Sequence, residues 1–160
     1  ELGVRYLVVA TTSGASAVEL RDLVGDRPMK VVGVTYHAGF HGGDGVMPVE
    51  RREELRARGI EVVICPHALS GVERSIKNQF GTIGPVELMA YCLRRFGEGI
   101  KVAVEIAVMA ADCAAAPTDE DIIAIGGSGK GADAAVVLKA AHQNNFFDLR
   151  VREIIAMVRG

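Results

Sequence analysis

The first apolar run of the chain ends in a cluster of hydroxyl residues, and this junction constrains the fold most. Residues 6–10 are apolar and β-prone, and Thr11, Thr12, Ser13 and Gly14 separate them from helix-forming residues that begin at position 15. The start of a helix leaves several backbone N–H groups without intrahelical partners, at the positive end of the helix dipole. The junction therefore predicts a site for a phosphate or carboxylate, with simple capping of the helix by a hydroxyl as the alternative.

Continuous apolar segments alternate with helical patterns along the rest of the chain. We expect strands at about 4–10, 30–35, 60–65 and 121–125 and at the C-terminus, and helices at about 15–24, 49–58, 85–96, 101–116 and 132–141. Residues 72–76 suggest a helical turn, and residues 78–82 a loop. Continuous apolar strands are typical of a parallel sheet that helices cover on both faces. We predict one α/β domain over residues 1–160, with its last strand at an edge of the sheet.

Composition excludes several classes of protein. Hydrophobic residues make up 49% of the chain and the net charge is −2, which argues against a disordered chain and against nucleic-acid binding by charge. No signal peptide is visible, and the longest apolar stretch, residues 102–116, is short and interrupted by two carboxylates, so we expect a cytoplasmic protein that does not enter membranes. Three cysteines without a C-x-x-C pair are expected to be reduced core residues. The start at Glu1, without Met and almost directly on a strand, suggests that residues precede it.

A second glycine-rich turn, residues 126–131, follows the predicted strand 121–125. With a helix expected from Ala132, it repeats the pattern of the opening junction, and Lys130 adds a positive charge. Ligands of open α/β sheets collect at the carboxyl ends of strands, so both turns are expected to face one crevice. The spacing is not that of a P-loop; it matches the dinucleotide pattern G-x-G-x-x-A, which alone supports a nicotinamide nucleotide only weakly.

The remaining candidates for chemistry are histidines and aromatic residues. His37 and His41 lie with Asp44 in the glycine-rich segment 36–45, where a metal site competes with ordinary loop residues, and we expect no metal. His67 follows the third predicted strand and should reach the ligand side of the sheet. No Ser-His-Asp spacing is present, and catalytic residues stay unassigned, as does enzyme activity itself.

Several blocks resemble a small stand-alone family of archaeal and bacterial proteins that are similar to the C-terminal α/β domain of pyruvate kinase. The blocks are VVATTSGASA (8–17), VTYHAGF (34–40), NQFG (78–81), EIAVMAAD (105–112), IGGSGKGAD (125–133) and FDLRVREII (147–155). The resemblance implies a three-layer α/β/α fold with a mixed sheet of about five strands, the last of them antiparallel. It also implies a helix before the first strand, and flavin mononucleotide (FMN) as a ligand of some members. Kinase activity is not implied, because pyruvate kinase performs its chemistry in a separate barrel domain.

Our first hypothesis is a small protein that binds FMN or another phosphate ester. The phosphate would lie against the hydroxyl junction, the second glycine turn would form the opposite wall, and the ring would lie near Thr35, His37 and residues 78–81. The candidate ligand-binding residues are Thr11, Thr12, Ser13, Gly14, Ser16, Thr35, His37, Asn78, Phe80, Gly81, Gly127, Ser128, Gly129 and Lys130. The alternatives are a regulatory or scaffold domain that binds a phosphorylated metabolite, and a flavin- or nicotinamide-dependent oxidoreductase. The expected partners are small molecules, with homo-oligomers left open.

Overall fold

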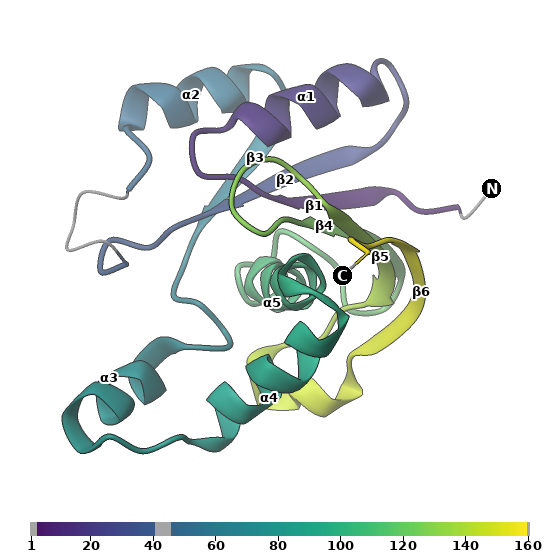
Figure 1. Ribbon diagram of the computed structural model, residues 1–160. Coiled ribbons are helices and arrows are strands. Elements are labelled where there is room, and N and C mark those ends of the chain that lie inside the picture. Colours follow the sequence, from purple (N-terminus) through teal and green to yellow (C-terminus); the bar gives the residue numbers. More distant parts are fainter. Residues whose placement is uncertain (1–2, 41–45, 160) are drawn as a thin grey trace.

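The computed structural model describes residues 3–40 and 46–159 and has a six-stranded mixed sheet at its centre (Figure 1). The strand order is β3-β2-β1-β4-β5-β6, and β1 to β4 are parallel. β5 runs antiparallel to both of its neighbours. The strands are β1 (Tyr6–Ala10), β2 (Lys30–Thr35), β3 (Ile60–Ile64), β4 (Asp121–Gly126), β5 (Ala134–Lys139) and β6 (Arg150–Ala156).

Helices cover both faces of this sheet (Figure 1). One face carries α1 (Ala15–Val24) and α2 (Val49–Ala57), and the other carries α5 (Glu98–Asp112). Beyond α5 lie α3 (Gly71–Phe80) and α4 (Pro85–Leu93), with short 3₁₀ segments η1 (Arg94–Phe96) and η2 (Gln143–Asp148). Among the described residues, no helix combines the length and the apolar character that crossing a membrane requires.

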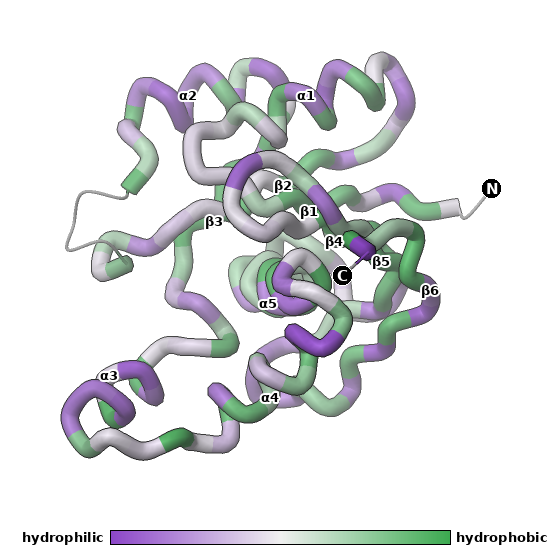
Figure 2. The backbone as a smooth tube through the Cα atoms, viewed as in Figure 1, coloured by the Kyte–Doolittle hydropathy of each residue, from purple (hydrophilic) through white to green (hydrophobic). Residues whose placement is uncertain are grey.

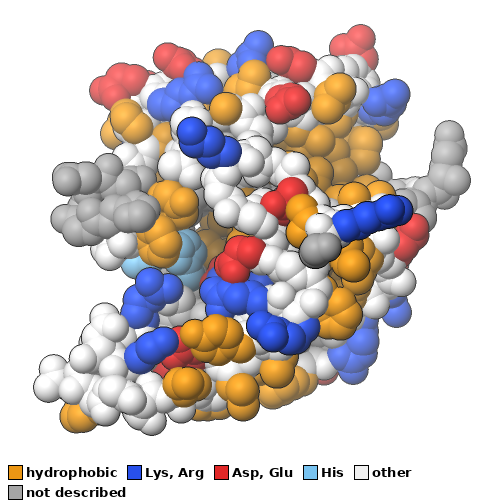
Figure 3. Space-filling view, in the orientation of Figure 1, with side chains coloured by type: hydrophobic (Ala, Val, Ile, Leu, Met, Phe, Trp, Pro, Cys, Tyr) orange, Lys and Arg blue, Asp and Glu red, His pale blue; other side chains and the backbone are white. Residues whose placement is uncertain are grey.

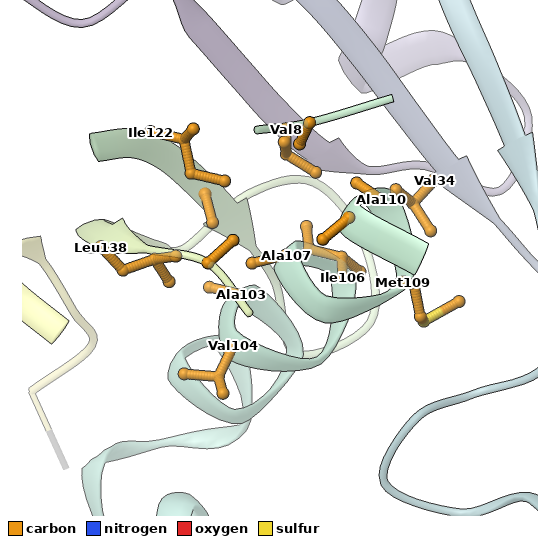
Figure 4. Packing of buried hydrophobic residues seen from close by; sticks show 14 of the residues in the cluster. Val8, Val34, Ala103, Val104, Ile106, Ala107, Met109, Ala110, Ile122 and Leu138 are labelled. Carbon is orange, nitrogen blue, oxygen red and sulfur yellow. The ribbon is translucent and has the colours of Figure 1, made fainter. Parts of the chain in front are cut away.

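Two separate apolar cores lie on the two faces of the sheet, because successive side chains of a strand point to opposite faces. Leu7 and Val9 of β1 pack toward Ala17 and Leu55 beneath α1 and α2. Val8, between them, packs into the cluster around α5, whose Ala103, Ala107 and Ala110 allow close approach to the sheet (Figure 4). Residues of the central strands are mostly hydrophobic, and hydrophilic residues gather on the outer helices (Figure 2).

The expected helix at 132–141 is wrong, since these residues form β5. Ala and Lys favour a helix locally, but Ala134–Lys139 pairs along its whole length with β4, which buries Val136 and Leu138 completely. This additional strand gives the sheet six strands in place of about five. The predicted edge position of the last strand is confirmed, because β6 ends the strand order and pairs antiparallel with β5.

Two further expectations need correction. Residues 78–80 belong to the last turn of α3, where a loop was expected. Cys92 and Cys113 are exposed and Cys65 is only half-buried, so the prediction of three core cysteines is wrong. Apolar neighbours in the sequence do not show whether a cysteine in or at the end of a helix faces the core or the solvent.

Candidate functional site

A cavity of about 610 Å³ opens at the carboxyl ends of β1, β2 and β4. α1 connects β1 to β2 on one face of the sheet, whereas the connection that ends in β4 returns through α5 on the other face. The strand order therefore reverses between β1 and β4, and ligands of open α/β sheets bind at such a reversal. Both turns expected from the sequence line this cavity, as does Thr35 at the end of β2.

The junction between β1 and α1 forms one wall. Thr12, Ser13 and Ser16 line the cavity beside the first turn of α1. No side chain caps α1 at its N-cap residue, although Ser13 Oγ accepts a 3.4 Å hydrogen bond from the Ala15 amide. The remaining first-turn amides have no intrahelical acceptors, so this wall offers donors to an anion.

Gly14 shapes this turn. Its φ is +86°, in the left-handed region, and a Cβ atom there would lie 2.7 Å from Leu55 Cδ1. Arg51 of α2 donates a 2.9 Å hydrogen bond to the Ser13 carbonyl oxygen and so holds the same turn from outside. Gly14 is not among the residues that line the cavity within the described ranges, so it supports the predicted site from behind.

Two threonines lie behind the junction. Thr11 is 7% exposed, and its hydroxyl is buried without a hydrogen-bond partner among the described residues. Thr35 Oγ1 donates to the Thr12 carbonyl oxygen at 3.4 Å. Both residues line the cavity. A buried hydroxyl without a partner is rare in folded proteins and often marks a site that is completed by water or ligand.

The opposite wall is the turn at residues 127–131, but it does not open a helix. It connects antiparallel β4 and β5, with the Ser128 amide donating to Asp133 Oδ2 at 2.9 Å. No helix dipole acts at this turn, so that part of the prediction is wrong. Gly127, Ser128, Gly129 and Lys130 nevertheless line the cavity, and the ammonium of Lys130 has no carboxylate partner among the described residues.

A cluster of rings closes another side of the cavity. Tyr36 and Phe40 stack with ring centroids 4.5 Å apart, and His67 meets Phe40 edge to face at 4.6 Å. Burial lowers the pKa of His67 below its ordinary value, which keeps the imidazole neutral near pH 7. His37 lies behind His67, with ring centroids 5.1 Å apart, and supports the cluster without lining the cavity in the described part of the chain.

The charged floor of the cavity was missed by sequence reasoning. Lys101 and Glu105 of α5 form a buried ion pair at 2.6 Å, and Glu105 Oε1 also accepts the Leu69 amide at 2.9 Å. Arg94 is paired with Glu98 at the start of the same helix. Both ion pairs have i, i+4 spacing. The one feature of the sequence that could have indicated this floor is Glu105, a carboxylate inside the apolar stretch 102–116.

Arg74 of α3 completes this wall. Its Nε donates to Ser70 Oγ at 2.8 Å and its guanidinium lies 5.8 Å from the centroid of the Phe40 ring. Among the described residues it has no carboxylate partner. Figure 3 shows a group of Lys, Arg and His side chains between the layer of α1 and α2 and the end of the molecule that carries α3 and α4, with further Lys and Arg side chains elsewhere on this face.

Besides Gly14 and His37, three further predicted residues do not line this cavity. Asn78 lines an adjoining chamber of about 500 Å³ between α3, α4 and α5. Phe80 is 73% exposed, and Gly81 ends α3 with a φ of +66°. His41 and Asp44 lie outside the described residues, and within the described ranges no group of three potential ligands could hold a metal ion.

No family model matches the chain. The class of site is therefore defined by its geometry alone: a mixed polar and apolar cavity at the reversal point of an α/β sheet, with excess cations and a ring-lined side.

Proposed function

We propose that this protein binds FMN through this cavity, and that it belongs with the proteins similar to the C-terminal domain of pyruvate kinase. The observation that carries the proposal is the convergence of the α1 N-terminus, the 127–131 turn and the ring cluster on one cavity. A volume of about 610 Å³ lies within the usual range of about 300–1,000 Å³ for small-molecule sites.

The phosphate of FMN fits the end of the cavity between the two turns. First-turn amides of α1 and the hydroxyls of Thr12, Ser13 and Ser16 supply donors on one side. Lys130 supplies a positive charge from the other side. Charge-assisted hydrogen bonds contribute about 1.5–3 kcal/mol each, so three or four of them account for micromolar affinity.

The planar ring fits the side formed by Tyr36, Phe40 and His67. Aromatic and apolar side chains there offer flat contact area, and Val34 and Met109 extend it toward the α5 face. A bound flavin supplies electron and hydride transfer, while this chain supplies binding, orientation and charge around the ring. The proposal assigns no catalytic residue.

The first test is the identity of the small molecule that the purified protein carries. We expect a flavin absorption spectrum and the mass of FMN in the material released by heat. Titration of the flavin-free protein should show FMN binding at least about tenfold tighter than riboflavin, because riboflavin lacks the phosphate and its hydrogen bonds. Equal affinities for FMN and riboflavin would contradict the assignment of the phosphate end.

Substitution of Ser13 tests the phosphate end directly. Ser13→Asp places a carboxylate where the phosphate is expected, and we predict a loss of FMN affinity of at least about 100-fold from like-charge repulsion. Ser13→Asn is the matched control: it has nearly the same shape without the charge and should retain binding within about tenfold. Both residues are good N-terminal helix residues, so folding should persist. Fluorescence quenching of free FMN measures both affinities, and unchanged binding by Ser13→Asp would remove the assignment.

Chemistry is tested separately from binding. Bleaching of the bound flavin by a nicotinamide donor, followed by reoxidation in air, would add an oxidoreductase activity to the binding role. A flavin that stays oxidised with every donor supports the binding or regulatory role alone.

A further inference from the structure

The helix α3 presents its apolar side to solvent. Val72, Ile76 and Phe80 recur at every fourth position and so share one face of the helix, where they are 79%, 43% and 73% exposed. The least exposed residues of α3 are instead the charged Glu73 and Lys77. A surface helix normally has the opposite arrangement, with its apolar stripe toward the protein.

The polar side of α3 is held inward by specific contacts. The Glu73 carboxylate accepts the amides of Val86, at 3.1 Å, and Glu87 at the start of α4. Lys77 is paired with Glu87, and Arg74 is bound to Ser70 at the cavity wall. Rotating α3 to bury its apolar side would break these contacts, so the apolar stripe is fixed in its outward orientation.

No residue of α3 is buried, and the helix lies at the end of the molecule remote from α1 and α2 (Figure 1). Ile83, in the connection between α3 and α4, is also exposed, at 62%. Contiguous apolar surface of this kind on a soluble domain marks an interaction site.

We propose that the stripe of Val72, Ile76 and Phe80 is covered by the same stripe of a second copy of this chain. A two-fold axis through the contact makes the two helices antiparallel and places Ile76 opposite Ile76 of the second copy. Val72 then faces Phe80 of the second copy at both ends, so a small side chain meets a large one. Self-pairing of the stripe is therefore complementary in shape.

The charges beside the stripe also favour a second copy of this chain as its partner. The residues on the flank of the stripe away from the protein are Ser75 and Gln79, which carry no charge, so two copies meet on that flank without opposing like charges. On the other flank Lys77 is paired with Glu87, and Glu73 accepts the amides at the start of α4. A membrane surface fits less well, because helices that lie on anionic lipid present Lys and Arg beside their apolar face. The cations of α3 are instead bound to groups of the same chain, Arg74 to Ser70 and Lys77 to Glu87.

The oligomeric state of the full chain tests this proposal. Light scattering after size exclusion, over about 5–200 µM protein, should give the mass of a dimer for the wild type. Ile76→Glu places two carboxylates against each other at the two-fold axis and should raise the dissociation constant at least about 100-fold, as Phe80→Ser should through lost apolar contact. Phe147→Ser is the matched control, since Phe147 is 78% exposed and lies outside α3, and it should remain dimeric.

A cross-link tests the geometry. In a chain with Cys92 and Cys113 replaced by Ser, Ile76→Cys should form an intermolecular disulfide with itself on mild oxidation. Leu23→Cys on α1, where the native side chain is 71% exposed, should not. Circular dichroism establishes that each variant is folded. A monomeric wild type at every concentration, or a dimer that survives both Ile76→Glu and Phe80→Ser, would overturn the proposal. A wild type that sediments with phosphatidylcholine and phosphatidylglycerol vesicles and loses this on Phe80→Ser would assign the stripe to lipid instead.

Discussion

At the scale of single residues, position 126 requires glycine because the backbone of α5 lies against it, a contact that no sequence motif describes. A Cβ atom there would overlap the Gly99 carbonyl oxygen and lie 2.8 Å from the Ala103 amide, both in the first turns of α5. We predict that Gly126→Ala lowers the free energy of unfolding by about 1–3 kcal/mol, because neither backbone can yield as a side chain would. Urea denaturation measures the change.

The control for this prediction is Gly39→Ala. The nearest atom to a Cβ at Gly39 belongs to the imidazole ring of His37, at an ordinary van der Waals distance of 3.4 Å, so the substitution should change the free energy of unfolding by no more than about 0.5 kcal/mol. Equal effects of the two substitutions would show that the close approach of β4 to α5 is not a constraint.

His67 provides a prediction on pH dependence. Burial is the main cause of its lowered pKa, opposed by the nearby carboxylate of Glu105. The unfolded chain therefore takes up a proton near pH 6.5 while the folded protein still resists it, so the free energy of unfolding falls as the pH drops through that region. His67→Asn should remove this part of the pH dependence. Urea denaturation between about pH 7.5 and pH 5.5 tests it, and a His67→Asn variant with an unchanged slope would contradict the assignment.

At the scale of elements, the sequence predicts best where local and tertiary preferences agree. The run from β1 through the hydroxyl turn into α1 has β-prone residues, turn residues and a helical apolar stripe in the right order, and the prediction for 15–24 matches α1. β5 shows the opposite case. Its residues favour a helix locally, and only pairing with β4, a contact absent from local sequence, makes them a strand.

α3 shows why part of the predicted site does not reach the cavity. The sequence suggests a loop at 78–82, which would place Asn78 and Phe80 beside the ring of a ligand. In the structure residues 78–80 continue α3, and the contacts of Glu73 with the N-terminus of α4 direct its apolar side to solvent. Hydrogen bonds between two helices cannot be predicted from the pattern of either helix alone, so the outward stripe required the structure.

At the scale of the whole molecule, the position of the site is more predictable than its lining. Parallel strands that end in polar turns place those turns at one edge of the sheet, and Ser13 and Ser128 do line one cavity there. The cations of the cavity come from α3, η1 and α5, whose packing against the sheet follows from no motif. Charge at the site was therefore predictable only for Lys130.

The two cores of the molecule also differ in a way that bears on the site. The core under α1 and α2 is apolar, whereas the core around α5 ends in the Lys101–Glu105 pair, whose side chains are 9% and 6% exposed. Glu105 joins three parts of the molecule, since it binds Lys101, accepts the Leu69 amide after β3 and lies on the cavity floor. Burying a charge pair stabilises a fold little, but removing one partner leaves an unpaired buried charge at a high cost in stability.

The Lys101–Glu105 pair gives a prediction on stability. Lys101→Met leaves the Glu105 carboxylate buried without its cation, and the free energy of unfolding should fall by about 3–5 kcal/mol. The double variant Lys101→Met/Glu105→Gln removes the stranded charge and keeps an acceptor for the Leu69 amide, so it should be more stable than the single variant in urea denaturation. A double variant no more stable than Lys101→Met would show that the unpaired Glu105 carboxylate is not the cause of the lost stability.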